Sequence, residues 1–89
     1  MEAASPPAVP YETLADRLRR ARIAARYSQD ELARVTGISR KTISRYENGH
    51  TIPRRPDLLA WAVACNVPLD WLTHGEPSAV AVLPRLDLA

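Results

Sequence analysis

The sequence contains one cysteine, Cys65, and no apolar run that approaches the roughly 20 residues needed to cross a bilayer. A single cysteine excludes an internal disulfide and a metal site of the CxxC type, so we expect Cys65 to be a small core residue. Residues 1–10 have neither the basic start nor the apolar stretch of a signal peptide. We therefore expect a cytoplasmic protein that has no membrane partner.

Catalytic chemistry is also scarce in the sequence. It shows no nucleophile spaced with a base, no paired carboxylates in an apolar setting and no metal-binding cluster. His50 could act as a metal ligand or a general base, but no second histidine or carboxylate cluster accompanies it. We expect no enzymatic activity, no metal, no cofactor and no small-molecule ligand.

Charge is distributed unevenly along the 89 residues, a length that suits one domain with a modest core. The net charge is only +2, yet residues 17–55 hold 11 of the 12 Lys and Arg residues and only three carboxylates, which gives this stretch +8. The remainder carries −6. Such asymmetry indicates a basic face for a polyanion, although a solvated charged surface would leave the same pattern.

Local signals for two short helices lie in residues 28–49, SQDELARVTGISRKTISRYENG. Ser28 and Glu31 have the spacing of a capping box, which predicts a helix that begins at Gln29. Gly37 can end that helix, because glycine adopts the left-handed conformation without strain. Ser39 then serves as the N-cap of a second helix, Arg40–Glu47. The stretch therefore predicts a helix, a short turn and a second helix.

The two faces of the second helix differ. Ile43 and Tyr46 are spaced to face inward, Ile38 fills the angle between the helices, and Ala33 is the small residue expected where they cross. The outward face carries long donors that reach guanine edges in a major groove, together with side chains small enough to allow close approach. The predicted base contacts are Arg40, Lys41, Thr42, Ser44 and Arg45.

The order SQ-x-E-L-A, a turn glycine, S-R-x-T-I-S-R and E-N-G resembles the XRE-like helix-turn-helix family, to which lambda repressor and Cro belong. The resemblance extends more weakly from Leu14 to Gly75. It implies an all-α fold, a compact five-helix domain that binds double-stranded DNA, usually as a dimer. Many members have glycine where this chain has Arg26, so the first helix must end here without glycine.

Phosphate contacts are expected around the motif. Gln29 lies at a helix N-terminus, where free amides and the helix dipole favour anions, and in the family this glutamine contacts the DNA backbone. The resemblance places the loop that follows the second motif helix along the phosphate backbone. Glu47 is expected to hold the turn between that helix and the loop. The predicted phosphate contacts are Arg22, Arg26, Gln29, Ser39, Asn48, His50, Thr51 and Arg54.

Three further helices are predicted from apolar periodicity. The first runs from Tyr11 or Glu12 to Ala25, the fourth starts at Pro56 or Asp57, and the fifth covers Leu69–His74. Their inward residues are Leu14, Leu18, Ala21 and Ala25 in the first helix, Leu58, Trp61, Ala62 and Cys65 in the fourth, and Leu72 with part of Trp71 in the fifth. Asn66 is expected to end the fourth helix in the left-handed region.

The fourth helix also carries Ala60, Val63 and Ala64 on its other side, which predicts a surface for a partner such as a second copy of the chain. Residues 1–10 are interpreted as a disordered leader, and a DNA-embracing arm is disfavoured because this segment has no Lys or Arg. Residues 11–75 form the predicted DNA-binding domain. In the tail, residues 76–89, Ala79–Leu83 can be a strand that pairs across a dimer axis or a disordered segment. A third alternative is that the apolar terminus, Leu88 and Ala89, marks the protein for proteolysis.

These features predict a sequence-specific transcriptional regulator, a small repressor of the phage Cro or immunity-repressor kind that reads a palindromic operator. It would act as a homodimer held by the fourth and fifth helices or by the tail. The alternative is an antitoxin or another protein-interaction module with autoregulatory DNA binding, for which Arg40 and Lys41 would be dispensable.

Overall fold

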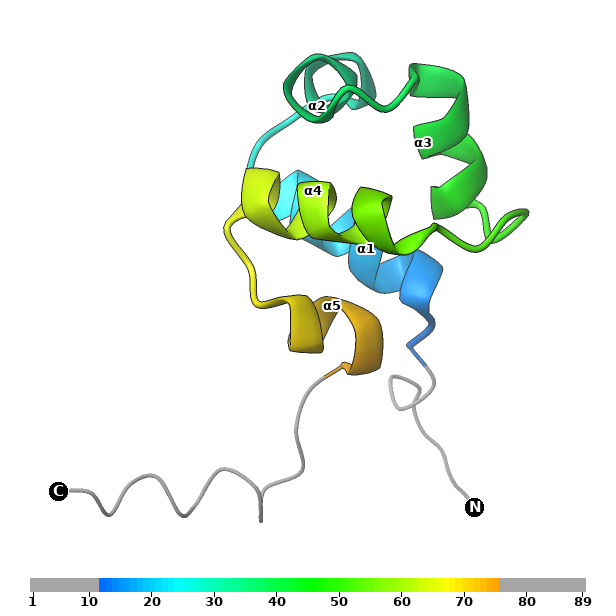
Figure 1. The fold of residues 1–89 in the computed structure, drawn as a ribbon, viewed down its shortest axis with the longest axis vertical. Coiled ribbons are helices and arrows are strands. Elements are labelled where there is room, and N and C mark those ends of the chain that lie inside the picture. The colour runs from blue at the N-terminus through cyan, green and yellow to red at the C-terminus, as the bar shows by residue number, and fades with distance from the viewer. Residues whose placement is uncertain (1–11, 76–89) are drawn as a thin grey trace, which may run out of the picture.

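Five α-helices account for most of residues 12–75, which are the residues that the computed structural model describes (Figure 1). They are α1 Leu14–Ala24, α2 Gln29–Thr36, α3 Arg40–Glu47, α4 Arg55–Cys65 and α5 Leu69–His74. No strand occurs within this part of the chain, and the predicted all-α, five-helix fold is confirmed. The predicted leader and the tail with its candidate strand lie outside the described residues.

Side-chain caps explain where the first three helices begin. The predicted capping box of α2 is present, because the Ser28 hydroxyl accepts from the Glu31 amide at 3.0 Å and the Glu31 carboxylate accepts from the Ser28 amide at 2.8 Å. Helix α1 starts at Leu14, later than expected, because Thr13 and Asp16 form a second reciprocal box. Both hydrogen bonds of that box measure 3.1 Å.

A residue with positive φ follows each of the five helices. Gly37 and Asn66 follow α2 and α4 with φ of 83° and 58°, as predicted. Helix α1 ends at Ala24, and Arg26, two residues later, has a φ of 65°. Here the Arg26 amide donates to the Ile23 carbonyl and the Tyr27 amide donates to the Arg22 carbonyl, the hydrogen-bond pattern of a Schellman motif. Arg26 thus adopts the conformation that glycine has without a steric penalty.

Replacing Arg26 with glycine is expected to raise the free energy of unfolding by about 0.5–1 kcal/mol. A left-handed L-residue costs about 1–2 kcal/mol, and the greater freedom of glycine in the unfolded chain offsets part of that gain. Urea unfolding followed by circular dichroism would measure the change. Arg26→Ala removes the side chain but keeps the strained backbone, so it should give no gain; equal stabilisation by both variants would contradict the prediction.

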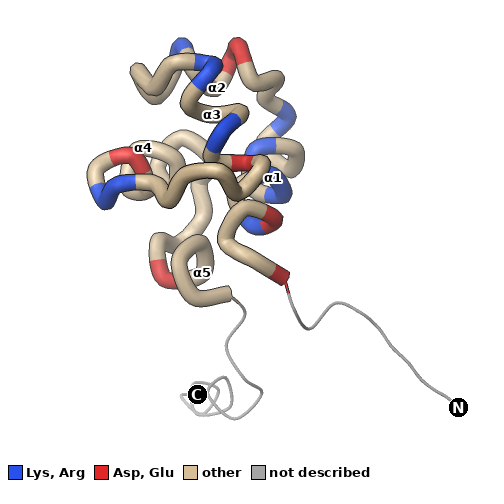
Figure 2. Tube along the Cα trace, turned by 90° about the vertical axis from the view of Figure 1, so that its right-hand side faces the viewer, with Lys and Arg blue, Asp and Glu red and all other residues tan. Residues whose placement is uncertain are grey.

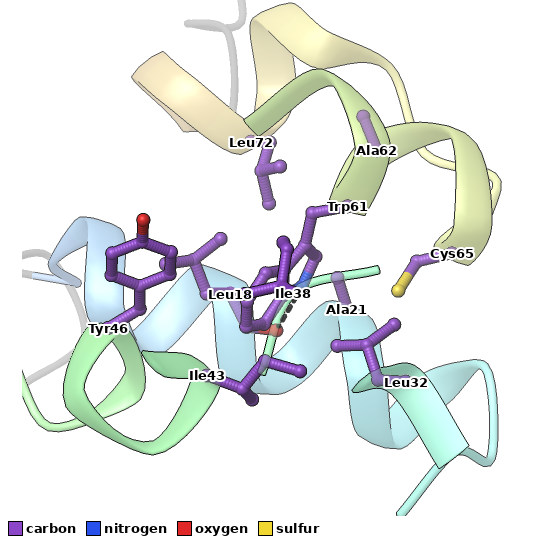
Figure 3. Close-up of a cluster of buried hydrophobic side chains, with 10 residues drawn as sticks. All are labelled: Leu18, Ala21, Leu32, Ile38, Ile43, Tyr46, Trp61, Ala62, Cys65 and Leu72. Carbon is purple, nitrogen blue, oxygen red and sulfur yellow. Dashed lines mark hydrogen bonds between the residues drawn. The ribbon is translucent and has the colours of Figure 1, made fainter. Parts of the chain in front are cut away.

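Trp61 lies at the centre of the core with no exposed surface (Figure 3). Its indole nitrogen donates to the Leu18 carbonyl of α1 at 3.1 Å. Side chains from all five helices and from the turn between α2 and α3 form the cluster of buried apolar residues, which comprises Leu18, Ala21, Leu32, Ile38, Ile43, Tyr46, Trp61, Ala62, Cys65 and Leu72. Each of the five helices contributes to this core, so packing fixes the position of α3 relative to the rest of the domain.

The predicted inward faces are confirmed, with one difference on α4. Leu14, Ala25 and Leu58 are partly buried against the core. Ala64, expected on the outer side of α4, also packs against the core. The exposed apolar strip consists instead of Leu59 and Val63, which are 51% and 72% exposed and lie one turn apart.

Arg17 is buried, although it was not predicted to face the core. Its Nε donates to the Leu72 carbonyl and its Nη2 to the Thr73 carbonyl, both at 2.9 Å. These are carbonyls of the last turn of α5, which have no partner inside the helix and are satisfied by a cation. Arg17 therefore fastens α5 to α1 through hydrogen bonds as well as apolar packing.

Cys65 is a buried free thiol, as predicted. Burial raises its pKa to about 11, so the thiol stays protonated at neutral pH and behaves as a small apolar group. Among the helices of residues 12–75, none has the length and apolar character required to cross a membrane.

Candidate nucleic-acid interface

Helix α3 has one buried side and one exposed side. Ile43 is fully buried and Tyr46 is 4% exposed, and the Tyr46 hydroxyl donates to Asp57 of α4. The opposite side carries Arg40, Lys41 and Arg45, all of them exposed. The inward and outward faces predicted from the spacing are therefore confirmed.

A hollow on the surface lies between the start of α2 and the exposed side of α3. It is lined by Gln29, Arg40, Lys41, Ser44 and Arg45. Four of the five predicted base contacts thus meet at one place, together with one predicted phosphate contact. Figure 2 shows the basic positions of α2 and α3 at one end of the molecule, whereas α5, which has no Lys or Arg, lies at the other end.

The fifth predicted base contact, Thr42, lies outside the hollow. It is half-buried, and its Oγ1 accepts a hydrogen bond of 2.9 Å from the Ser39 hydroxyl. The Ser39 oxygen in turn accepts from the Thr42 amide at 3.1 Å, so Ser39 is the N-cap of α3 as predicted. The Ser39 and Thr42 hydroxyls are thus both engaged in hydrogen bonds at the start of α3.

Two arginines of α3 contact residues from other elements. The Arg40 Nε lies 3.5 Å from the Asp30 Oδ1 of α2. The Arg45 Nη2 donates to the Thr51 Oγ1 in the following loop at 3.1 Å. Each contact joins an arginine of α3 to a residue outside that helix. The contacts therefore restrict the orientations that the two guanidinium groups adopt.

Glu47 occupies the centre of a buried ion pair beneath this face. Its two carboxylate oxygens accept from Arg22, from Nε at 2.6 Å and from Nη2 at 2.9 Å. Gln29 donates its side-chain amide to the same carboxylate at 3.2 Å. The side chains of Arg22 and Glu47 are 14% and 4% exposed. Glu47 is structural, as predicted, but these bonds join α1, α2 and α3 and do not involve the turn after α3 that it was expected to hold.

Arg22 was predicted to contact a phosphate, and in the free protein its side chain is bonded to other residues of the domain. Besides the two bonds to Glu47, its Nη1 donates to the Tyr27 carbonyl at 3.0 Å, so all three of its nitrogens are engaged. The hydrogen bond to Glu47 raises the pKa of Arg22 further, so the guanidinium remains charged. In the free protein Arg22 thus joins α1 to α3, and its contact with a phosphate stays a prediction.

Of the other predicted phosphate contacts, Gln29 lines the hollow and the rest come from the segments before and after α3 and after α1. Six of them are exposed: Arg26 after α1, Ser39 before α3, and Asn48, His50, Thr51 and Arg54 after α3. Asn48 also donates to the Ser44 carbonyl at 2.9 Å, a bond that secures the end of α3. The amide of Gln29 reaches Glu47 while its backbone remains in the first turn of α2.

Sequence reasoning missed the contacts of Asp30 and Thr51, although it identified both arginines that they touch. Asp30 precedes Arg40 by ten residues on a different helix, a distance at which no local spacing rule applies. Among residues 12–75, no group of three or more His, Cys, Asp and Glu side chains is placed to hold a metal ion.

Comparisons with known proteins agree with this arrangement. A helix-turn-helix family model matches residues 18–72. The crystal structure of the P22 c2 repressor in complex with a synthetic operator is 30% identical and covers 71% of this chain and 96% of that chain, with a TM-score of 0.66. The solution structure of the P22 c2 repressor DNA-binding domain is 28% identical and covers 72% of this chain and 84% of that chain, with the same TM-score.

A third structure, a hypothetical transcription factor named NHTF from Neisseria, is 28% identical, with coverage of 94% of this chain and 95% of that chain and a TM-score of 0.67. The family match and the likeness to repressors agree with the fold and the basic face described above. The chain belongs to the lambda-repressor-like, XRE-type helix-turn-helix family and is a sequence-specific DNA-binding transcriptional regulator of the repressor kind.

Proposed function

We propose that this protein represses transcription in the cytoplasm by binding a palindromic operator as a homodimer, with α3 of each subunit in a major groove. The observation that carries the proposal is the hollow lined by Gln29, Arg40, Lys41, Ser44 and Arg45. It places long donors beside a helix N-terminus, which suits base edges next to a phosphate. Occupying DNA in this way would exclude polymerase, and this mode of control needs no catalytic group.

Base contacts are assigned to the exposed side of α3, and phosphate contacts to its surroundings. Arg40 and Lys41 occupy the first turn of α3, and residues at the start of a recognition helix reach deepest into the groove. Ser44 and Arg45 follow one turn later. Phosphate contacts fall to the exposed residues around α3 and to Gln29, where they position the protein without reading sequence.

The dimer is assigned to the exposed strip of Leu59 and Val63 on α4. These side chains are 51% and 72% exposed, and the half-buried Ala60 beside them would allow two helices to approach closely. A two-fold axis at this strip would pack Leu59 of one subunit near Val63 of its partner, as an isologous contact requires. Two half-sites about one helical turn apart would then be bound together.

Replacing Arg40 with alanine is expected to weaken operator binding by about 1–3 kcal/mol and to relax one symmetric pair of operator positions, because a bidentate guanine contact is lost. Bound sites would be selected from a random duplex pool at near-physiological salt with the wild type and the variant side by side. Arg34→Ala, a change of another exposed arginine that lies on α2, is the control and should leave the consensus intact.

Each result of that selection decides something. A palindromic consensus supports a dimer on an operator. A single asymmetric site would contradict the dimer but would still support sequence-specific binding through base contacts. If the folded wild type enriched no sequence, the basic face would serve weak non-specific binding, and the antitoxin or interaction-module function would replace the proposal.

Replacing Val63 with glutamate is expected to weaken dimerisation by roughly tenfold or more, because burial of an apolar side chain contributes about 1.5–3 kcal/mol and a buried charge is unfavourable. Sedimentation equilibrium would measure the change. Ile23→Glu introduces the same charge at an exposed apolar residue of α1 and should leave dimerisation unchanged. Equal effects of the two variants would place the interface elsewhere.

A further inference from the structure

Asp30 is an acidic residue on a face otherwise built to meet a polyanion. Residues 17–55 contain three carboxylates, and two of them have structural roles: Glu31 belongs to the capping box of α2, and Glu47 binds Arg22 and Gln29. Asp30 does neither, and its side chain is 67% exposed. A favourable interaction with the dipole of α2 accounts for an acid in this turn, but not for its contact with a base-reading arginine.

The geometry connects Asp30 to one edge of Arg40. The Asp30 Oδ1 lies 3.5 Å from the Arg40 Nε, at the base of the guanidinium. A carboxylate at Nε leaves the two terminal nitrogens available, and these can donate together to O6 and N7 of guanine. Arg40 is the first residue of α3 and its side chain is 63% exposed, so this end of the guanidinium points away from the core.

The energetics give Asp30 opposite effects on affinity and on specificity. An ion pair as exposed as this one contributes little to the free protein, because water screens it. In a groove that excludes water, the effective dielectric constant falls and the carboxylate holds the arginine more strongly. The same negative charge repels phosphates, so binding to any duplex is weakened while one orientation of Arg40 is favoured.

We propose that Asp30 is a positioning residue that fixes Arg40 for guanine and so increases sequence discrimination at the expense of overall affinity for DNA. This inference rests on the proposed reading of an operator by α3. It assigns specificity to a residue of α2 that itself touches no base.

The test measures binding of Asp30→Ala to three duplexes: the selected operator, the same operator with the guanine pair opposite Arg40 replaced, and a random sequence. Discrimination between the first two is expected to fall roughly five- to tenfold, since the bidentate contact loses its fixed geometry. Affinity for the random duplex should rise roughly threefold, because a charge facing the phosphates is gone. Asp30→Asn should give the same direction of change.

Glu31→Gln is the matched control, because it removes a neighbouring charge while glutamine still completes the capping box. It should raise affinity for the random duplex without loss of discrimination. In an Arg40→Ala background, Asp30→Ala should leave discrimination at this base pair unchanged.

The outcomes separate this inference from the proposed function. A wild type that discriminates while Asp30→Ala and Asp30→Asn discriminate equally well would overturn the role of Asp30 and leave operator binding intact. A loss of discrimination in Glu31→Gln of the same size would also overturn it, because any acid in this turn would then suffice. If the folded wild type showed no discrimination at all, both the proposed function and this inference would fail. Thermal unfolding of each variant shows that the compared proteins are folded.

Discussion

Replacing Glu47 with alanine is expected to lower the free energy of unfolding by about 3 kcal/mol, near the lower end of the range for breaking a buried ion pair. The reason is the guanidinium that remains. Arg22 is 14% exposed and would lose both hydrogen bonds to the carboxylate, leaving a charge with little access to water. Gln29 would lose its acceptor as well. Urea unfolding followed by circular dichroism would measure the loss.

The control for this prediction removes both charges. Arg22→Met combined with Glu47→Met leaves no unpaired buried group, and replacement of a buried pair by apolar residues is often neutral or stabilising. The double variant should therefore recover much of the stability lost in Glu47→Ala. If Glu47→Ala lost less than about 1 kcal/mol, water would be solvating Arg22 and the pair would behave as a surface ion pair.

Helix limits followed from the sequence wherever the signal is local. The bounds of α3 and α5 agree with the predicted residues, and α2 begins at Gln29 as expected. At the start of α2 and of α3, a serine hydroxyl accepts a hydrogen bond from the backbone amide three residues later, so a few neighbouring residues specify where each helix begins. The start of α1 was missed because its box uses aspartate at Asp16 where glutamate or glutamine is usual.

Side-chain partners between helices were not predictable in the same way. The exposed side of α3 followed from helical periodicity, but Arg22 and Glu47 are 25 residues apart and meet only because α1 and α3 pack together. The sequence does not distinguish an arginine that faces DNA from one that faces a buried carboxylate, because either can occur in a helix rich in basic residues. Arg17 shows this too, although its place next to Leu18 and three residues after Leu14 put it near the inner face of α1.

Trp61 is the central residue of the apolar core, as Glu47 is the central residue of the buried ion pair. Replacing Trp61 with alanine is expected to lower the free energy of unfolding by about 3–5 kcal/mol, because the change removes a fully buried indole and leaves a cavity that the helices fill only in part. The hydrogen bond to the Leu18 carbonyl and the contact with the Tyr46 ring, 6.3 Å between centroids, are lost as well. For a domain of this size such a loss approaches the whole stability.

Trp71 supplies the matched control for Trp61→Ala, because the chain contains only these two tryptophans. Trp71 is half-buried on α5 and has the Arg20 guanidinium 5.6 Å from its ring centroid. Its replacement with alanine should cost about 1–2 kcal/mol, since it removes less buried surface and one partly exposed cation–π contact. Thermal and urea unfolding of both variants would compare them directly. Equal losses would mean that the α1–α5 contact contributes as much to stability as the packing around Trp61. That outcome would contradict the prediction that Trp61 contributes most to the stability of the core.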